Sequence, residues 1–227
     1  MRALLFTTES PFARAVRIVL DELGLDYERR EEITTPSIEE RAAATPTLQV
    51  PTFWDGEQTL WESGTIVEYL LSTYRNRPAA EPPLTIDAFR PDSEWQDKLA
   101  FSTIQTFGSA ATIICQMKWS GVDSTNNAHM KRSAEKLAHI LRWLEEQLND
   151  ATGGFLPDCV SIQDIFLAAH VRFVQNRPLG VDLVLGQCPK LEALLNRLDD
   201  RESFKANPVW WWEPGIVGYQ PDGTPIF

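Results

Sequence analysis

Apolar positions near the start of the chain form a short run and then a longer stretch with helical spacing. Ala3–Phe6 is a brief apolar run between polar residues, typical of a strand buried on both faces. Ser10 suits the cap of a following helix, Pro11 its first position and Gly24 its end. One face of that helix is apolar, formed by Phe12, Val16, Val19, Leu20 and Leu23. The segment therefore predicts a strand, a turn and an amphipathic helix.

Three further strand signals and a helix signal follow before residue 75. Tyr27–Ile33 is rich in charge and is included only because a βαβ unit needs a second parallel strand. Pro51–Trp54 and Gln58–Trp61 flank Asp-Gly, a pair that accepts the positive φ angles of a tight hairpin turn. Ser63 is placed to cap the next helix, whose buried stripe is Ile66, Val67, Leu70, Leu71 and Tyr74.

The pattern changes after a proline-rich segment, Arg75–Pro91. Beyond it nearly all the periodicity is helical, with stretches at Trp95–Lys118, Leu137–Leu148, Ile162–Phe173 and Pro189–Leu198. We therefore predict an α/β domain at residues 1–77, a linker at 78–91, and an all-helical domain at 92–227. Ser161-x-x-Asp164 has the form of a capping box and predicts a structural role at a helix start.

The net charge and the lengths of the apolar stretches disfavour some partners and locations. The 227 residues hold 21 Lys and Arg against 32 Asp and Glu, a formal net charge of −11. Such a balance disfavours nucleic acid and anionic membrane surfaces as partners. The opening apolar run is too short for a secretory signal, and no stretch is long enough to span a bilayer. We expect a cytoplasmic protein.

Metal and cofactor motifs are missing from the sequence. Cys115, Cys159 and Cys188 form no Cys-x-x-Cys pair, and the three histidines show no ligand spacing with them. No Gly-x-Gly-x-x-Gly or phosphate-cradling loop occurs. The expectation is reduced thiols, no metal site and no bound cofactor.

Three separated segments resemble the glutathione transferase family, in the same order and spacing. They are Ser10–Arg17, which is similar to the active-site turn of serine-type members; Gln49–Thr52 with Trp61–Ile66; and Gly154–Leu156 with Ser161–Ile165. The resemblance covers most of the chain, from Leu4 to about Phe204. It implies a thioredoxin-like first domain that holds glutathione and a helical second domain that holds the other substrate.

Ser10 is the residue that the resemblance marks as catalytic. It would donate a hydrogen bond to the glutathione sulfur, and the helix N-terminus beside it favours negative charge. The alternative is that Ser10 is only a helix cap. Thr7 and Thr8 lie near enough in sequence to replace it as the donor. The Cys-Pro turn of thiol-exchanging members is absent, because Ser10 stands in that place.

The resemblance also assigns residues to the rest of glutathione. Val50–Pro51 matches a cis-proline corner whose backbone pairs with the glutathione backbone, with an ordinary trans proline as the alternative. Glu62 and Ser63 would bind the γ-glutamyl amino and carboxylate groups, and Phe12 would line the site. Gln49 or Arg41 would meet the glycine carboxylate. At Thr45–Leu48 the sequence departs from the common Asn-Pro pattern, so the residue for the glycine end stays open.

The second substrate is expected between the domains, beside the long helix at Trp95–Lys118. Candidate residues are Phe107, Ile114, Cys115 and Trp119, although an aromatic stripe of this kind also fits plain core packing. The run Trp210–Trp212 is expected to fasten the tail to the body.

The leading interpretation is a detoxifying glutathione transferase that attacks small hydrophobic electrophiles with the glutathione thiolate. By resemblance it would be a homodimer. One alternative is a catalytically silent module of the same fold that binds ligands or proteins. Another is a specialised glutathione-dependent etherase, dehalogenase or isomerase. The sequence leaves the electrophile unidentified.

Overall fold

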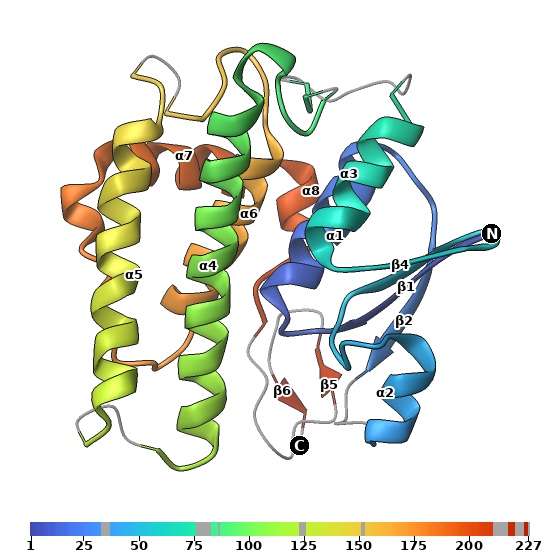
Figure 1. Ribbon diagram of the computed structural model, residues 1–227, viewed down its shortest axis with the longest axis horizontal. Coiled ribbons are helices and arrows are strands. Elements are labelled where there is room, and N and C mark those ends of the chain that lie inside the picture. The colour runs from blue at the N-terminus through green and yellow to red at the C-terminus, as the bar shows by residue number, and fades with distance from the viewer. Residues whose placement is uncertain are drawn as a thin grey trace.

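The computed structural model describes residues 1–32, 37–75, 83–85, 87–122, 126–150, 153–210, 218–220 and 225–226. A four-stranded mixed sheet with its helices forms the first part, and a group of long helices forms the second (Figure 1). This is the α/β plus helical architecture that the sequence predicts. The linker at 78–91 and the boundaries of the two domains remain a prediction, and residues 78–82 and 86 lie outside the described ranges.

The sheet has the strand order β2-β1-β3-β4. β1 (Arg2–Thr7) pairs in parallel with β2 (Glu28–Glu32) and antiparallel with β3 (Thr52–Asp55), which continues through a turn into β4 (Gln58–Trp61). Gly56 has φ +61° in that turn, as the Asp-Gly signal predicts. The charged β2 is accommodated because it is an edge strand with mostly exposed residues.

The helices of the first part are α1 (Pro11–Glu22), α2 (Ile38–Ala44) and α3 (Ser63–Thr73). α1 packs against both α3 and the helical part, so it stands between the sheet and the long helices (Figure 1). Sequence reasoning did not predict α2, which is short and buries none of its residues but carries a complete Ser37–Glu40 capping box.

The helical part contains α4 (Glu94–Trp119), α5 (Ala128–Gln147), α6 (Ile162–Gln175), α7 (Pro189–Asp199) and the short α8 (Glu202–Lys205). Two 3-10 turns, Pro91–Ser93 and Leu185–Gln187, precede α4 and α7. α6 is the centre of this part: twelve of its residues are buried, and it packs against α1, α4 and α7. The four helices predicted here are confirmed.

The capping box at the start of α6 is confirmed in full. Ser161 Oγ accepts a hydrogen bond from Asp164 N at 3.1 Å, and Asp164 accepts from the Ser161 backbone N–H at 2.8 Å. Asp164 also accepts from the backbone N–H of Phe155 at 3.0 Å, which ties the preceding loop to the helix. The residue is therefore structural, as predicted.

The end of the chain differs from the all-helical prediction. β5 (Gly218–Tyr219) and β6 (Pro225–Ile226) form a small antiparallel pair. Trp211 and Trp212 lie outside the described residues. The backbone carbonyl of Trp210 accepts a hydrogen bond from Arg177 at 3.0 Å, so the start of the tail is attached by its backbone to the segment that follows α6.

Candidate functional site

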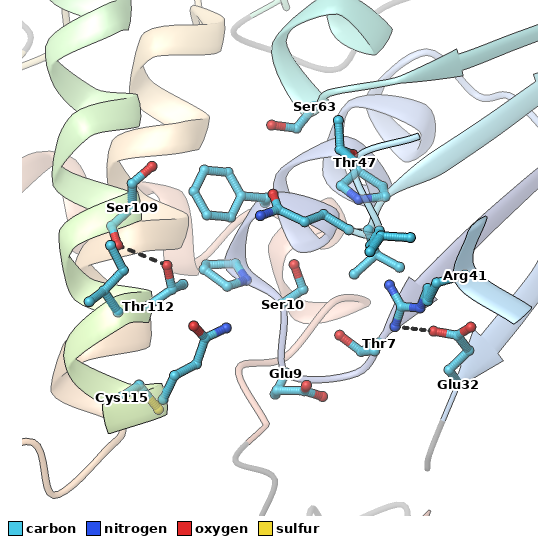
Figure 2. Close-up of a pocket in the computed structure, with 18 of the residues that line it drawn as sticks. Thr7, Glu9, Ser10, Glu32, Arg41, Thr47, Ser63, Ser109, Thr112 and Cys115 are labelled. Carbon is cyan, nitrogen blue, oxygen red and sulfur yellow. Dashed lines mark hydrogen bonds and ion pairs between the residues drawn. The ribbon is translucent and has the colours of Figure 1, made fainter. Parts of the chain in front are cut away.

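A cavity of about 680 Å³ lies where the sheet part meets α4 (Figure 2). Its walls come from the turn after β1, from α2, from the loop before β3, from the start of α3 and from one face of α4. That volume is within the usual range for small-molecule sites. Two of the three motif segments marked in the sequence, Ser10–Arg17 and Gln49–Thr52 with Trp61–Ile66, are therefore brought to one place, whereas the third forms the start of α6 and contributes no lining residue.

Ser10 stands at the N-terminus of α1 and lines this cavity. Its Oγ accepts a hydrogen bond from the backbone N–H of Ala13 at 3.2 Å, so it is a true helix cap. A hydroxyl that accepts still has its own hydrogen to donate. Ser10 can therefore cap α1 and also donate a hydrogen bond to a ligand, two roles that the sequence analysis gave as alternatives.

The two neighbouring threonines are in different positions. Thr8 is buried, and its hydroxyl donates to Glu31 Oε1 at 2.5 Å. Thr7 lines the cavity and faces the same space as Ser10 (Figure 2). Of the two alternatives weighed against Ser10, only Thr7 is placed to reach a bound ligand.

The loop before β3 presents its backbone to the cavity. The Val50–Pro51 peptide bond is cis, as the resemblance implies. Gln49, Val50 and Pro51 all line the cavity. Leu48 just before them has φ +58°, a left-handed conformation that is uncommon for a residue with a β-carbon. Such conformations persist mainly where the surrounding structure requires them, often at ligand sites.

Ser63 is not the cap of α3, which corrects the sequence-based prediction. It is the first helical residue, and Glu62 occupies the cap position with φ +65° and no side-chain cap bond. This left-handed turn at Glu62 directs the chain from β4 into α3. Both residues line the cavity; Ser63 is only 4% exposed, whereas Glu62 is open to solvent.

The part of the cavity wall formed by β2 and α2 carries two charged residues. Arg41 of α2 lines the cavity and forms an ion pair with Glu32 at the end of β2 (Figure 2). Burial raises the pKa of the Glu32 carboxyl, and the positive charge of Arg41 opposes that rise. Thr45 and Thr47 share a hydroxyl hydrogen bond at 3.0 Å beside them.

Phe12 lines the cavity from α1, and its ring meets the fully buried His170 edge-on, with 4.6 Å between ring centroids. His170 comes from α6, so the contact joins the two parts of the chain directly behind the cavity. Phe12 is thus a wall residue whose position depends on the helical part.

Two of the four predicted second-substrate residues lie away from the cavity. Phe107 and Ile114 are fully buried in the core and are not among the lining residues, which corrects that prediction. They are seven positions apart, so they share one face of α4, and that face packs inward. Cys115 and Trp119 do line the cavity, with Gln105, Ser109, Thr112, Ile113 and Gln116 from the same helix.

Glu9 is a lining residue that sequence reasoning did not consider. Burial raises the pKa of its carboxyl, against the effects of a Thr7 hydrogen bond and the charges of Arg177 and Arg41. Its backbone carbonyl accepts from Arg177 at 3.2 Å, which holds the residue beside Ser10.

The Cys115 thiol is a poor nucleophile, because burial raises its pKa to about 11.

Metal chemistry finds no support in the part of the chain that the structure describes, where no group of three or more His, Cys, Asp or Glu residues could hold an ion. Over the same ranges, no helix combines the length and apolarity needed to cross a bilayer.

Comparison with known families decides the family. The model of the glutathione S-transferase N-terminal domain matches residues 4–78, and that of the C-terminal domain matches residues 127–197. The chain belongs to the glutathione S-transferase family. Nothing in the match separates serine-type members from the others.

Individual relatives agree with this glutathione S-transferase assignment. A curated protein of Aspergillus terreus, described as glutathione S-transferase-like protein gedE, is 42% identical over 65 residues. That match spans 26% of this chain and 27% of the relative, so the chain covers only about a quarter of the curated relative's length.

Solved structures share the fold over nearly the whole chain. A glutathione S-transferase of Methylobacterium radiotolerans in complex with glutathione sulfonate is 22% identical, covers 96% of this chain and 98% of its own, and has a TM-score of 0.75. One of Methylobacillus flagellatus with glutathione bound is 21% identical, covers 91% and 98%, and has a TM-score of 0.71. The nitrogen regulation fragment of the yeast prion protein Ure2p is 20% identical, covers 91% and 95%, and has a TM-score of 0.69.

Proposed function

We propose that this glutathione S-transferase family member binds glutathione in the cavity and holds its thiol as a thiolate for attack on a second, electrophilic substrate. The observation that carries the proposal is Ser10, which keeps a hydroxyl hydrogen for a ligand while capping α1 at the cavity wall. Unpaired N–H groups and the helix dipole at that terminus also favour a negative charge there.

One hydrogen bond from Ser10 to the glutathione sulfur supplies enough energy to activate the thiol. A free thiol of the cysteine type titrates near 8.5, so only a few per cent is thiolate at neutral pH. A hydrogen bond to a charged acceptor contributes about 1.5–3 kcal/mol, which lowers the thiol pKa by about one to two units. Thiolate then becomes a major species at neutral pH. Ser10 would act as a donor and not as the nucleophile.

The remaining parts of glutathione are assigned to the other walls. The backbone of Val50 would pair with the tripeptide backbone. Glu62 would accept from the γ-glutamyl ammonium, and Ser63 with the first N–H groups of α3 would donate to its carboxylate. Arg41 or Gln49 would meet the glycine carboxylate at the opposite end. The support for these assignments is that all five residues line one cavity.

The second substrate would lie against α4, next to Ser10. Ile113, Trp119 and Phe173 supply apolar surface there, and Ser109, Thr112 and Gln116 supply polar groups. We therefore propose a small electrophile with an apolar body that carries a hydrogen-bonding group. The sulfur electron pair would form the new carbon–sulfur bond, and the displaced pair would leave with a leaving group or move into a conjugated acceptor. The protein's part is proximity and thiolate stabilisation.

Two alternatives use the same cavity. A regulatory or binding module without catalysis is favoured by one observation, the shared fold with the nitrogen regulation fragment of Ure2p. A specialised etherase, dehalogenase or isomerase would have the same glutathione site and differ only at the α4 wall. The specialised enzymes would be distinguished from a general transferase by the electrophiles that they turn over. A silent module would be distinguished by a bound glutathione whose thiol pKa is not lowered.

We also propose a cytoplasmic homodimer with a role in detoxification. Support for association is the exposed apolar surface at the start of α4, where Trp95 is 71% exposed and Leu99 63% exposed. Sedimentation velocity on the whole chain tests this, with a species of twice 25.7 kDa expected. A monomer at micromolar concentration would contradict it.

The function itself is tested by titrating the protein with glutathione in a calorimeter. The expected result is binding at micromolar to millimolar concentration with turnover of a conjugated or halogenated electrophile. Binding without turnover of any electrophile class would favour the regulatory module, and no binding at millimolar glutathione would refute the proposal.

A further inference from the structure

Two hydrogen bonds in series connect α6, α4 and α3 behind the cavity. The Gln105 side-chain Nε2 donates to Ser63 Oγ at 3.4 Å, and His170 Nε2 pairs with Gln105 Oε1 at 3.4 Å. Ser63 and Gln105 both line the cavity, whereas His170 is fully buried behind them. The series therefore runs from the core of the helical part to the first residue of α3.

Two glycines allow this close approach. A β-carbon on Gly64 would lie 3.0 Å from a ring carbon of Phe101 and 3.5 Å from Gln105 Nε2. A β-carbon on Gly108 would lie 2.5 to 2.7 Å from three atoms of the His170 ring. Real β-carbons essentially never come within 3.0 Å of another atom, so Gly108 admits no side chain without a shift, whereas the 3.0 Å distance at Gly64 is tight but possible. The backbone is thus shaped so that α3 can touch α4 and the imidazole can sit against α4.

The surroundings of His170 fix its protonation. Its ring is packed edge-on against Phe12 at 4.6 Å and Phe166 at 6.0 Å. Burial lowers its pKa to about 3, so the imidazole is neutral at physiological pH and carries a single N–H. Nδ1 has no hydrogen-bond partner among the described residues. A bare lone pair is tolerated there better than a buried, unpaired N–H, which favours the tautomer with hydrogen on Nε2.

That tautomer sets the direction of the Gln105 amide. An N–H on His170 Nε2 must face the carbonyl oxygen of Gln105, so the amide nitrogen faces Ser63. Ser63 Oγ then accepts, and its own hydrogen stays available. With the amide reversed, Ser63 would donate to Gln105 and would have no hydrogen left for a ligand.

We propose that Gln105, oriented by His170, is a positioning residue that leaves the Ser63 hydroxyl free to donate to the α-carboxylate of the γ-glutamyl group of glutathione. This inference rests on the proposed function, which places that carboxylate at Ser63. It adds that the helical part helps to hold glutathione as well as the second substrate.

The test is a binding cycle with two ligands. Calorimetry measures wild type and Gln105→Met with glutathione and with 4-aminobutyryl-cysteinylglycine, which lacks only the α-carboxylate. Methionine keeps the length of the side chain but cannot donate a hydrogen bond to Ser63 Oγ. We expect Gln105→Met to weaken glutathione binding about three- to tenfold and to change binding of the analogue less than twofold. Gln147→Met, on an exposed glutamine of α5, is the matched control and should change neither.

The outcomes separate this inference from the proposed function. Equal weakening of both ligands by Gln105→Met, or no weakening of either, would overturn the role of Gln105 while glutathione binding by the wild type stands. Failure of the wild type to bind glutathione would overturn the proposed function, and this inference with it.

A second readout needs no variant of Gln105. The ¹⁵N shifts of the His170 ring in the wild-type protein report which nitrogen carries the hydrogen, with His170→Asn used to assign the signal. Hydrogen on Nε2 is expected between pH 6 and 8. Hydrogen on Nδ1 would contradict the proposed amide direction.

Discussion

Ser10 Oγ accepts a hydrogen bond from the Ala13 backbone N–H at 3.2 Å while the same side chain lines the cavity. The helix cap thereby fixes the position of the hydroxyl oxygen, and only the direction of its hydrogen stays adjustable. Capping and thiolate stabilisation are thus two uses of one side chain, and they predict separable effects of substitution.

Replacement of Ser10 tests this separation. Ser10→Ala and Ser10→Gly both remove the hydroxyl donor, so each should raise the thiol pKa of bound glutathione by about one to two units. Alanine at a cap costs about 1 kcal/mol of stability, but glycine costs only a few tenths. Thiolate absorbance against pH and urea unfolding measure the two effects. Unchanged thiol pKa in both variants, with a raised value in Thr7→Val, would identify Thr7 as the donor.

Glu9 should oppose thiolate formation when it is ionised. Its carboxyl faces the same cavity as Ser10, and two negative charges in one site disfavour each other. Glu9→Gln should lower the pKa of bound glutathione, by about one unit or less. Glu146→Gln, on an exposed residue of α5, is the control. A thiol pKa that rises in Glu9→Gln would show that Glu9 supports the thiolate by another route.

His170 should make the protein sensitive to acid. Its pKa is lowered by burial to about 3 in the folded protein and is near 6.5 when unfolded, so the unfolded chain binds more protons between those values. Stability from this group is complete above pH 6.5 and falls by about 1.4 kcal/mol per pH unit below it. Urea unfolding from pH 7 to 4 should therefore show a shallower loss for His170→Asn. Equal slopes would contradict a neutral buried imidazole.

Asp164 should matter for stability and not for the site. Its carboxylate accepts from the Ser161 backbone N–H and hydroxyl, both at 2.8 Å, and from the Phe155 backbone N–H at 3.0 Å. Asp164→Ala leaves these buried donors without a partner, a loss on the order of 3 kcal/mol. Ser161→Ala should cost about 1 kcal/mol. Glutathione affinity of the folded variants should equal that of wild type, and a specific loss of affinity would contradict a purely structural role.

Local signals were sufficient for most elements of the fold. Strand β1, helix α1 and the hairpin at Asp55-Gly56 follow from short-range patterns, because apolar period, caps and turn residues act within a few positions. Ser10 and the Val50–Pro51 corner were assigned to the site by the family resemblance, and the structure places both at the cavity wall. Each belongs to a contiguous motif of the first part.

The positions of other residues around the cavity depend on contacts between residues that are distant in the sequence. Phe107 and Ile114 were predicted to face the second substrate, but which face of α4 turns inward is decided by packing against α5 and α6. Ser63 was predicted as a cap, and the left-handed φ of Glu62 moved the helix start by one residue. The link between Gln105 and His170 spans 65 positions, and no local pattern carries it.

The thiol pKa of glutathione bound to the wild-type protein tests the central claim most directly. Ultraviolet difference absorbance of the thiolate, followed from pH 5 to 10, gives that value. We predict a pKa about one to two units below that of the free thiol, and a return toward the free value in Ser10→Ala. Saturated binding with an unshifted thiol pKa would contradict thiolate activation by this protein.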